Sequence, residues 1–279
     1  MAETAFQIQY RQEFIHGFEQ LQSLVRGTVT TEAVIKGNQA TFLVADSGGA
    51  RMVTRGVNGL IPARSDNLTQ LTATLLEKHD MPQRTEFNLV SSQGEGRRIM
   101  QATTMGVMNR EIDQDIIDAL ENGSITTGTT TTASLALCAK AKALLGKNKV
   151  RFDGQITALI TPAYENYLIQ TKEFASADYI SNKPLDGSAP VQSYGYYNWI
   201  GVKWIVHPDL PGANTSDEKC FMYHRDAVGH AVNMNGEGIH AGYDEQQAYA
   251  WARASIYMGG KLLQNNGVVV INHDGSILA

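Results

Sequence analysis

The stretch Met105–Leu120, MGVMNREIDQDIIDAL, decides the fold. Its large apolar residues recur three or four positions apart, which is the spacing of one face of an α-helix. Its acidic residues Glu111, Asp115 and Asp118 fall on a different face. We therefore expect a helix over residues 104–121. The apolar stripe consists of Met105, Met108, Ile112, Ile116 and Leu120.

Downstream of this helix the sequence alternates between helical and strand patterns. A Thr-rich linker at 123–134 leads into a second helix at 132–145, and a strand at Gln155–Thr161 stops before a short helix at 163–170. The mixture indicates an α+β fold class. The remaining expected elements are strands at Tyr196–Val206, Cys220–Tyr223, Ala248–Met258 and Val268–Asn272, and a helix at Asp226–Val232.

Upstream, residues 27–98 resemble an extended β arm. Thr28–Val34 and Gln39–Ala45 are β-like runs separated by Lys36-Gly37-Asn38, which is a hairpin signal. Large apolar side chains are sparse, so the arm needs a neighbour to lie on. An amphipathic helix at residues 3–26 likewise needs a partner for its apolar stripe. Further β-like runs are Arg51–Thr54, Gln70–Glu77 and Glu86–Val90.

The composition excludes several classes of protein. The chain has 279 residues, is 43% hydrophobic and carries a formal net charge of -5, without the strong basicity of a nucleic-acid-binding domain. Cys138 and Cys220 make no disulfide framework, and we expect both to be buried thiols. The sequence has neither a signal peptide nor a run of about 20 apolar residues. We therefore expect no membrane association.

No catalytic, cofactor or metal motif is recognisable. His224 beside Asp226, or His273 beside Asp274, offers an imidazole and a carboxylate for a general base. Neighbours in sequence do not face each other on a helix or strand, however. We also expect no cation site at Asp113, Asp115 and Asp118, because Asp113 and Asp115 diverge on a helix and the glycine that an EF-hand loop needs is absent. A soluble enzyme that uses His224 and Asp226 stays an alternative, and we expect no enzyme, cofactor or metal.

Seven segments in order resemble the major capsid proteins of tailed bacteriophages, which have the Johnson fold and share it with encapsulin shell proteins. Each pattern is loose, but the order covers nearly the whole chain. The matching stretches are FIHGFEQLQSLVRGTVTTEAV at 14–34, MGVMNREIDQDIIDAL at 105–120, TASLALCAKAKALLG at 132–146, GQITALITPAYENYLIQ at 154–170, YGYYNWIGVKWIVHPDLPG at 194–212, CFMYHRDAVGHAV at 220–232 and RASIYMGGKLLQNNGVVVI at 253–271.

The resemblance implies a division of the chain. Its parts would be an N-terminal arm helix at 1–26, an E-loop β arm at 27–98, a P-domain with its long spine helix at 99–125, an A-domain at 126–235, and a P-domain loop with closing strands at 236–279. The function it implies is assembly through pentamers and hexamers into an icosahedral phage head around double-stranded DNA. An encapsulin-type compartment is the alternative with the same fold.

The resemblance also implies partners and a location. The chain would bind copies of itself, a portal, possibly a decoration protein, and packaged DNA by weak, non-specific contact. Because the arm begins close to Met1, we expect scaffolding either to come from a separate protein or not to be used. The protein would be found in the virion, and in the host cytoplasm during assembly.

Charge predicts where subunits meet. Residues 26–98 hold nine Lys or Arg against seven acidic residues, a charge of about +2, whereas residues 105–121 carry -4 from one Arg and five acidic residues. We expect Arg51, Arg55 or Arg64 to reach Glu111, Asp115 or Asp118 of an adjacent subunit. The resemblance implies a second contact at loop 238–247, through Asp244 and Glu245.

Overall fold

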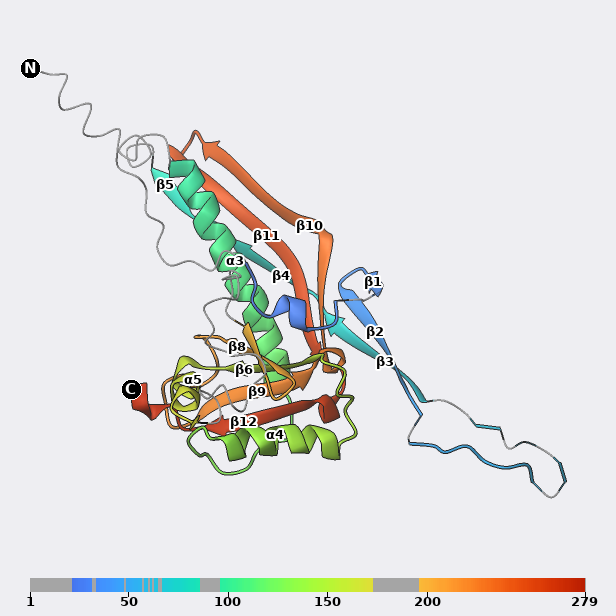
Figure 1. Ribbon diagram of the computed structural model, residues 1–279. Coiled ribbons are helices and arrows are strands. Elements are labelled where there is room, and N and C mark those ends of the chain that lie inside the picture. Colours follow the sequence, from blue (N-terminus) through green and yellow to red (C-terminus); the bar gives the residue numbers. More distant parts are fainter. Residues whose placement is uncertain are drawn as a thin grey trace, which may run out of the picture. The chain divides into compact units, whose positions relative to one another are not determined.

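The computed structural model describes the backbone of residues 22–31, 34–47, 49–56, 58–59, 61, 63–64, 67–85, 96–172 and 196–278. The contacts of the chain divide it into two units. Over the described residues, the first unit comprises 22, 79–85, 96–110 and 238–255, and the second comprises those within 23–78, 111–172, 196–237 and 256–278. The five-part division expected from the resemblance remains a prediction. Figure 1 shows the elements.

The long helix is confirmed. Helix α3, Gly96–Glu121, starts two turns earlier than the apolar stripe indicated. In the second unit Ile112, Ile116 and Leu120 are buried. Met105, in the first unit, is 43% exposed, so the stripe is not a core face along its whole length. Within the described residues, no helix is both long enough and apolar enough to cross a membrane.

A five-stranded sheet forms the core of the second unit. Strand β6, Ile156–Ile160, is buried at every position and pairs parallel with β8 and antiparallel with β9. Helix α4, Leu135–Lys147, contacts β12 and β9 (Figure 1). The sheet order is β12 (Val268–His273), β9 (Glu218–His224), β6, β8 (Val202–Val206) and β7 (Tyr196–Trp199).

Side-chain caps start both helices of this region. The Ser134 hydroxyl accepts from the Leu137 N–H and so caps α4. The Thr161 hydroxyl accepts from the Tyr164 N–H at the start of α5, Pro162–Ile169. Pro162 is the first residue of α5. The first N–H groups of a helix have no partner within the helix, so the missing N–H of proline is tolerated at this position.

Two expected elements differ in the structure. Tyr196–Val206 is a hairpin and not one strand, because Ile200 and Gly201 adopt positive φ between β7 and β8. The helix expected at Asp226–Val232 is wrong. Only the 3-10 turn Arg225–Ala227 is helical, and β10, Val228–Asp244, follows it. The local pattern carries no information on contacts that are distant in the sequence. Gly229 lies so close to the Phe42 ring that a Cβ would be 2.6 Å from it.

A second sheet joins elements from distant parts of the chain. Its order is β10, β11 (Tyr249–Leu262) and β4 (Leu76–Asp80), and β5 (Gln83–Thr85) also pairs with β11. The strand expected at Ala248–Met258 is confirmed and extends four residues further. The short 3-10 turns η3, Asn265–Gly267, and η4, Ser276–Leu278, lie near the chain's end.

The arm is a three-stranded antiparallel sheet at its base. Strands β1 (Val34–Lys36), β2 (Gln39–Asp46) and β3 (Asn67–Thr74) lie in sequence order, and Gly37 makes the first turn with a φ of 62°. The base has a small core, which the arm completes with a residue of β10. This core consists of Ala40, Phe42, Ala73, Leu75 and Ala231.

Several sequence-based expectations for the N-terminal third are changed or lie outside the described residues. Arg51–Thr54 is not a strand. Around Thr28–Val34 the chain forms the 3-10 turn η1, Arg26–Thr28, and a single bridge from Thr30 to Gly229. Most of the helix expected at 3–26 and the β-like run at Glu86–Val90 lie outside the described residues.

Candidate functional site

The acidic face of α3 is met by a lysine of the same chain. Lys78 Nζ lies 2.6 Å from Glu111 Oε1 and 3.7 Å from Asp115 Oδ1. Partial burial lowers the pKa of Lys78, but the bond to Glu111 and the charge of Asp115 outweigh this, so that its pKa is raised. The repulsion between Glu111 and Asp115, which stand four residues apart on the helix, is therefore offset within the chain.

The last turn of α3 presents two further carboxylates. Asp118 is exposed, and its Oδ1 accepts from Gln114 Nε2 at 2.7 Å. Glu121 Oε1 lies 2.5 Å from Lys219 Nζ. Asp118 is thus the acidic residue of this face that has no cation partner among the ion pairs of the described residues.

Asp113 faces the interior and holds the chain that leads into the arm. Its carboxylate accepts from the Ser23 hydroxyl and from the Leu24 and Val25 N–H groups at 2.9 and 3.2 Å. His207 Nε2 lies 3.6 Å away. Burial raises the pKa of Asp113, but the neighbouring His207 and the three donors outweigh that effect and lower it. Asp113 therefore fixes residues 23–25 to α3.

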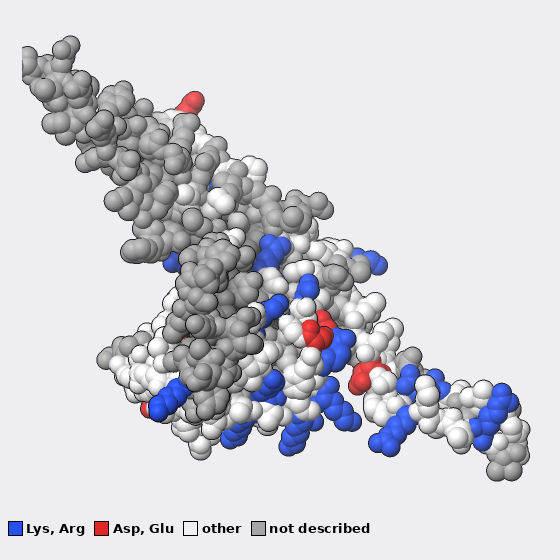
Figure 2. Space-filling model, viewed as in Figure 1, with Lys and Arg blue, Asp and Glu red and all other residues white. Residues whose placement is uncertain are grey.

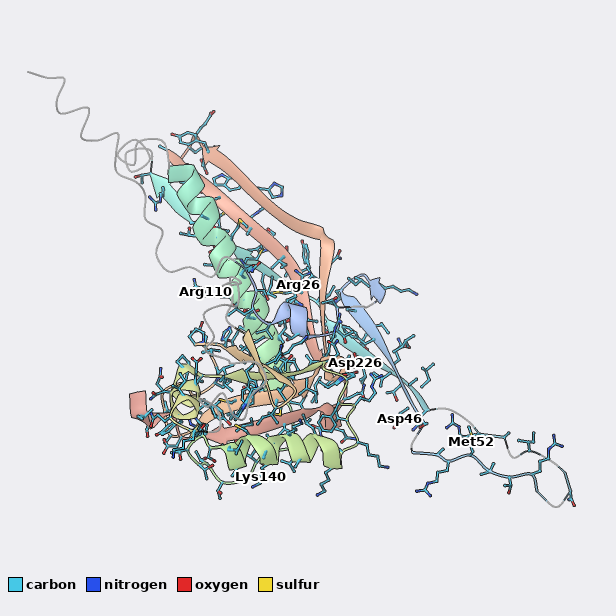
Figure 3. All side chains as sticks on the ribbon, viewed as in Figure 1. Arg26, Asp46, Met52, Arg110, Lys140 and Asp226 are labelled. Carbon is cyan, nitrogen blue, oxygen red and sulfur yellow. The ribbon has the colours of Figure 1, made fainter. Side chains whose placement is uncertain are left out.

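The far part of the arm exposes both arginines and apolar side chains. Arg51, Arg55 and Arg64 are all exposed, and Arg55 Nη1 donates to Gly59 O at 3.3 Å (Figure 3 labels the nearby Met52). The structure contains one chain, so the expected contact of these arginines with a neighbour remains a prediction. The apolar residues of the far arm, each at least 63% exposed, are Met52, Val53 and Ile61, and Leu43 and Leu68 of the base strands are exposed to a similar extent.

The turn between β10 and β11 is shorter than expected. Residues 238–244 belong to β10, and only 245–248 turn the chain. Asp244 Oδ1 accepts from the N–H groups of Gln246 and Gln247 at 2.9 and 3.2 Å, which is an Asx turn. Glu245 is exposed. Asp244 therefore shapes the turn, and Glu245 supplies the accessible charge.

The side chains of His224 and Asp226 both bind other residues of the chain. His224 Nδ1 accepts from the Asp226 N–H at 3.1 Å, and its Nε2 lies 3.1 Å from Asp153 Oδ1. The Asp226 carboxylate pairs with Arg151 at 2.5 Å. Both ring nitrogens are engaged by the chain itself, so neither is left to take a proton from a substrate.

The His273 pair is different from the one the sequence suggested. Its Nδ1 lies 2.8 Å from Glu218 Oε1, and both side chains are fully buried. Glu218 also accepts from the Thr161 hydroxyl and the Asn214 N–H. Burial raises the pKa of Glu218, but the hydrogen bonds from His273, Thr161 and Asn214 outweigh the effect of burial. The pKa of Glu218 is therefore lowered. The Asp274 carboxylate instead accepts from the Ser276 N–H.

The thiols offer no nucleophile. Cys138 and Cys220 are free and buried, as expected. Burial raises the pKa of Cys138 to about 11 and that of Cys220 further still, so both stay protonated at neutral pH. Among the described residues, no group of three or more His, Cys, Asp or Glu is placed to hold a metal ion.

The comparison with protein families accounts for these surfaces. The family model described as phage capsid protein matches residues 2–275. The chain belongs to the phage capsid protein family. It is a major capsid protein, a building block of an icosahedral shell, and its role in the virion is structural.

Solved phage capsid structures show the same fold. A chain of Mycobacterium phage Che8 is 19% identical with a TM-score of 0.70, and the match covers 93% of each chain. A chain from the capsid of the cyanophage P-SCSP1u is 11% identical with a TM-score of 0.68, covering 94% of this chain and 91% of that one. A capsid chain of an empty GTA particle is 12% identical with a TM-score of 0.64, covering 94% of both. No curated protein sequence matches the chain.

The capsid protein also has a basic segment that was not among the sequence-based predictions. Residues 122–152 contain five Lys or Arg and no Asp or Glu. A whole-chain charge of -5 conceals this segment, and a count over a 30-residue window would have found it. Figure 2 shows Lys and Arg side chains gathered along the edge where α4 lies in Figure 1.

Proposed function

We propose that this capsid protein assembles through pentamers and hexamers into a phage head that encloses double-stranded DNA, and that the arm of each subunit lies on its neighbour. The observation that carries the proposal is the cluster of exposed apolar side chains on the far arm, which includes Met52, Val53 and Ile61. Large apolar side chains exposed together on one extended segment suit an interaction surface. A head-to-tail contact round a ring would cover them, and such an interface is heterologous.

The arm deletion that tests this proposal has to spare the core of the arm base. Phe42 belongs to that core, and Val44 pairs with Thr69 across the hairpin. Replacing residues 45–68 by Asn-Gly keeps this register, because Asn-Gly closes a two-residue hairpin. We expect a soluble, folded subunit that forms no closed shells in electron micrographs. Normal shells from this variant would refute the proposed role of the arm.

A matched variant separates arm length from arm chemistry. M52S/V53S/I61S keeps the arm intact and removes its exposed apolar groups. Their burial is worth about 25 cal/mol per Å², so the triple variant should assemble only at a higher protein concentration than wild type. An unchanged concentration threshold, measured by light scattering, would mean that these side chains face solvent in the shell.

For the charged contact we propose that Arg51, Arg55 or Arg64 reaches the acidic face of the adjacent subunit's α3. Glu111 and Asp115 already have Lys78 beside them, so Asp118 is the most available of the three carboxylates. Exposed pairs contribute only about 0.2–1 kcal/mol each, so these contacts set register. D118K should reduce the yield of closed shells, and an arm Arg→Glu change should restore it if the pair is direct.

We further propose that the subunit acts with a separate scaffolding protein, a portal and possibly a decoration protein, first in the host cytoplasm and then in the virion. Contact with the enclosed DNA is weak and independent of base sequence. Electron microscopy and nucleic-acid extraction from purified particles test the enclosure. Particles that carry a cargo enzyme in place of DNA would make the chain an encapsulin-type shell.

A further inference from the structure

The basic segment at 122–152 has the opposite net charge to the rest of the chain. It carries +5, so the remaining residues carry -10, with 18 basic and 28 acidic residues. A local positive excess in an acidic protein attracts anionic groups without specificity.

The fold turns part of this segment outward. Helix α4 buries Leu137, Cys138, Ala141 and Leu145. Lys140 and Lys147 are exposed and seven residues apart, so they share one side of the helix about 10 Å from each other at 1.5 Å per residue. Lys149 is exposed in the turn that follows, where it adopts a φ of 60°. Figure 3 labels Lys140 on α4. We call these three lysines the α4 basic surface.

Two other cations of the segment serve the fold. Lys142 Nζ donates to Ile200 O at 2.5 Å and lies 5.4 Å from the centre of the Phe152 ring. Arg151 pairs with Asp226. By contrast, the hydrogen bonds and ion pairs found between described residues leave the ammonium groups of the α4 basic surface unengaged. The dipole of α4 explains a lysine in its last turn, Lys147, but not Lys140 in mid-helix.

We propose that the α4 basic surface contacts the phosphate backbone of the DNA inside the shell, which rests on the proposed enclosure of DNA. Duplex DNA presents one charge about every 1.7 Å along its axis, so mobile ammonium groups find phosphates without a fixed register. Lysine is depleted at protein interfaces, which argues against a neighbouring subunit as the partner. Three such contacts give weak binding that falls with salt and reads no base sequence.

Cross-linking tests the contact directly. In DNA-filled particles treated with formaldehyde, peptide mapping should find DNA adducts on Lys140, Lys147 or Lys149. Adducts confined to other lysines, such as Lys36 or Lys203, would overturn the proposal. Nucleic-acid extraction from the purified particles precedes the peptide mapping. Particles that contain no DNA would contradict the proposed enclosure of DNA, which is a different failure from that of the α4 basic surface.

Substitution gives the second readout. Unassembled wild-type capsomers should bind a short DNA duplex with an affinity that falls steeply as salt rises. In K140Q/K147Q/K149Q the slope of log K against log salt should be smaller by about 3 for a duplex that meets one subunit, at about 0.9 per lost contact. The matched control K36Q/K172Q/K261Q removes three other exposed lysines, and its slope should stay near that of wild type.

The remaining outcomes count against the proposal. Equal slopes in the two triple variants would show that the α4 basic surface is not the DNA contact, and so would wild-type capsomers that do not bind DNA. If the α4 variant alone fails to form shells, the three lysines lie at a contact between subunits.

Discussion

Two buried carboxylates hold together segments that are distant in the sequence. Asp113 fixes residues 23–25 to α3, and Glu218 joins Thr161, Asn214 and His273. Each accepts several hydrogen bonds, which makes the ionised form favourable despite burial. A carboxylate with several donors is hard to replace, because each donor left without an acceptor stays desolvated.

Asp113→Asn should destabilise the unassembled subunit by about 2 kcal/mol. The asparagine keeps one acceptor, but its NH₂ group replaces either Oδ2, which accepts from the Leu24 N–H, or Oδ1, which accepts from the Val25 N–H, so one of these two donors loses its acceptor. The midpoint of urea unfolding, followed by tryptophan fluorescence, measures the change. The control Asp118→Asn alters an exposed carboxylate and should shift stability by less than about 0.5 kcal/mol. Equal midpoints for the two variants would show that Asp113 does not hold residues 23–25.

The same two groups predict the direction of the pH dependence. Their folded pKa values lie below the usual 3.8 for Asp and 4.5 for Glu. Their contribution is therefore complete above those values and is lost as pH falls through the lower, folded pKa values. Wild-type subunits should lose stability below about pH 4, and Asp113→Asn should lose less over that interval. Parallel pH curves for the two proteins would contradict this assignment.

At the scale of elements, close backbone approaches join the arm to the body of its unit. A Cβ on Gly229 would lie 2.6 Å from the Phe42 ring, and one on Gly259 would lie 2.4 Å from Thr74 O. The second contact is with backbone, which cannot rotate away. Strand β11 and the end of β3 thus approach so closely that only glycine fits.

Gly259→Ala should therefore weaken the arm base. We expect a loss of about 1–3 kcal/mol, the usual range for overpacking, and a lower yield of closed shells because the arm is misdirected. Gly27→Ala is the control, since a Cβ there meets nothing within 4 Å and its φ is not positive. Thermal unfolding and electron microscopy measure the two effects. A Gly259→Ala protein that matches Gly27→Ala in both would show that the close approach is relieved at little cost.

The periodic elements were predictable from sequence, and the contacts between them were not. Helix α3, helix α4 and strand β6 follow from apolar spacing and caps, which are local signals. Asp226–Val232 has helical spacing, but only a 3-10 turn to Ala227 is helical and β10 begins at Val228, where Gly229 lies against Phe42 from 187 residues earlier. The charge pattern indicated that α3 needs a cation, and Lys78 provides one within the chain. Sequence alone could not choose between that lysine and an arginine of another subunit.

At the scale of the whole molecule, charge is separated by surface. Acidic groups gather on α3, basic groups lie on the far arm and along α4, and the β10–β11 turn carries two adjacent carboxylates. In a closed shell each copy must satisfy every contact at once, so a weak term repeated over all copies decides whether the shell closes. The surfaces therefore need to be tested for closure separately from subunit folding.

The β10–β11 turn gives the sharpest test of that separation. Glu245→Lys reverses the exposed charge, while Asp244→Asn removes a charge and keeps the Oδ1 acceptor that shapes the turn. If this turn meets symmetry-related copies where capsomers join, D244N/E245K should still form capsomers but few closed shells. Sedimentation separates the two species. The control D209N/D217K makes the same charge change at other exposed residues and should assemble as wild type does. Equal loss of capsomers and shells in D244N/E245K would place the turn inside the capsomer, and normal shells would remove it from the assembly contacts.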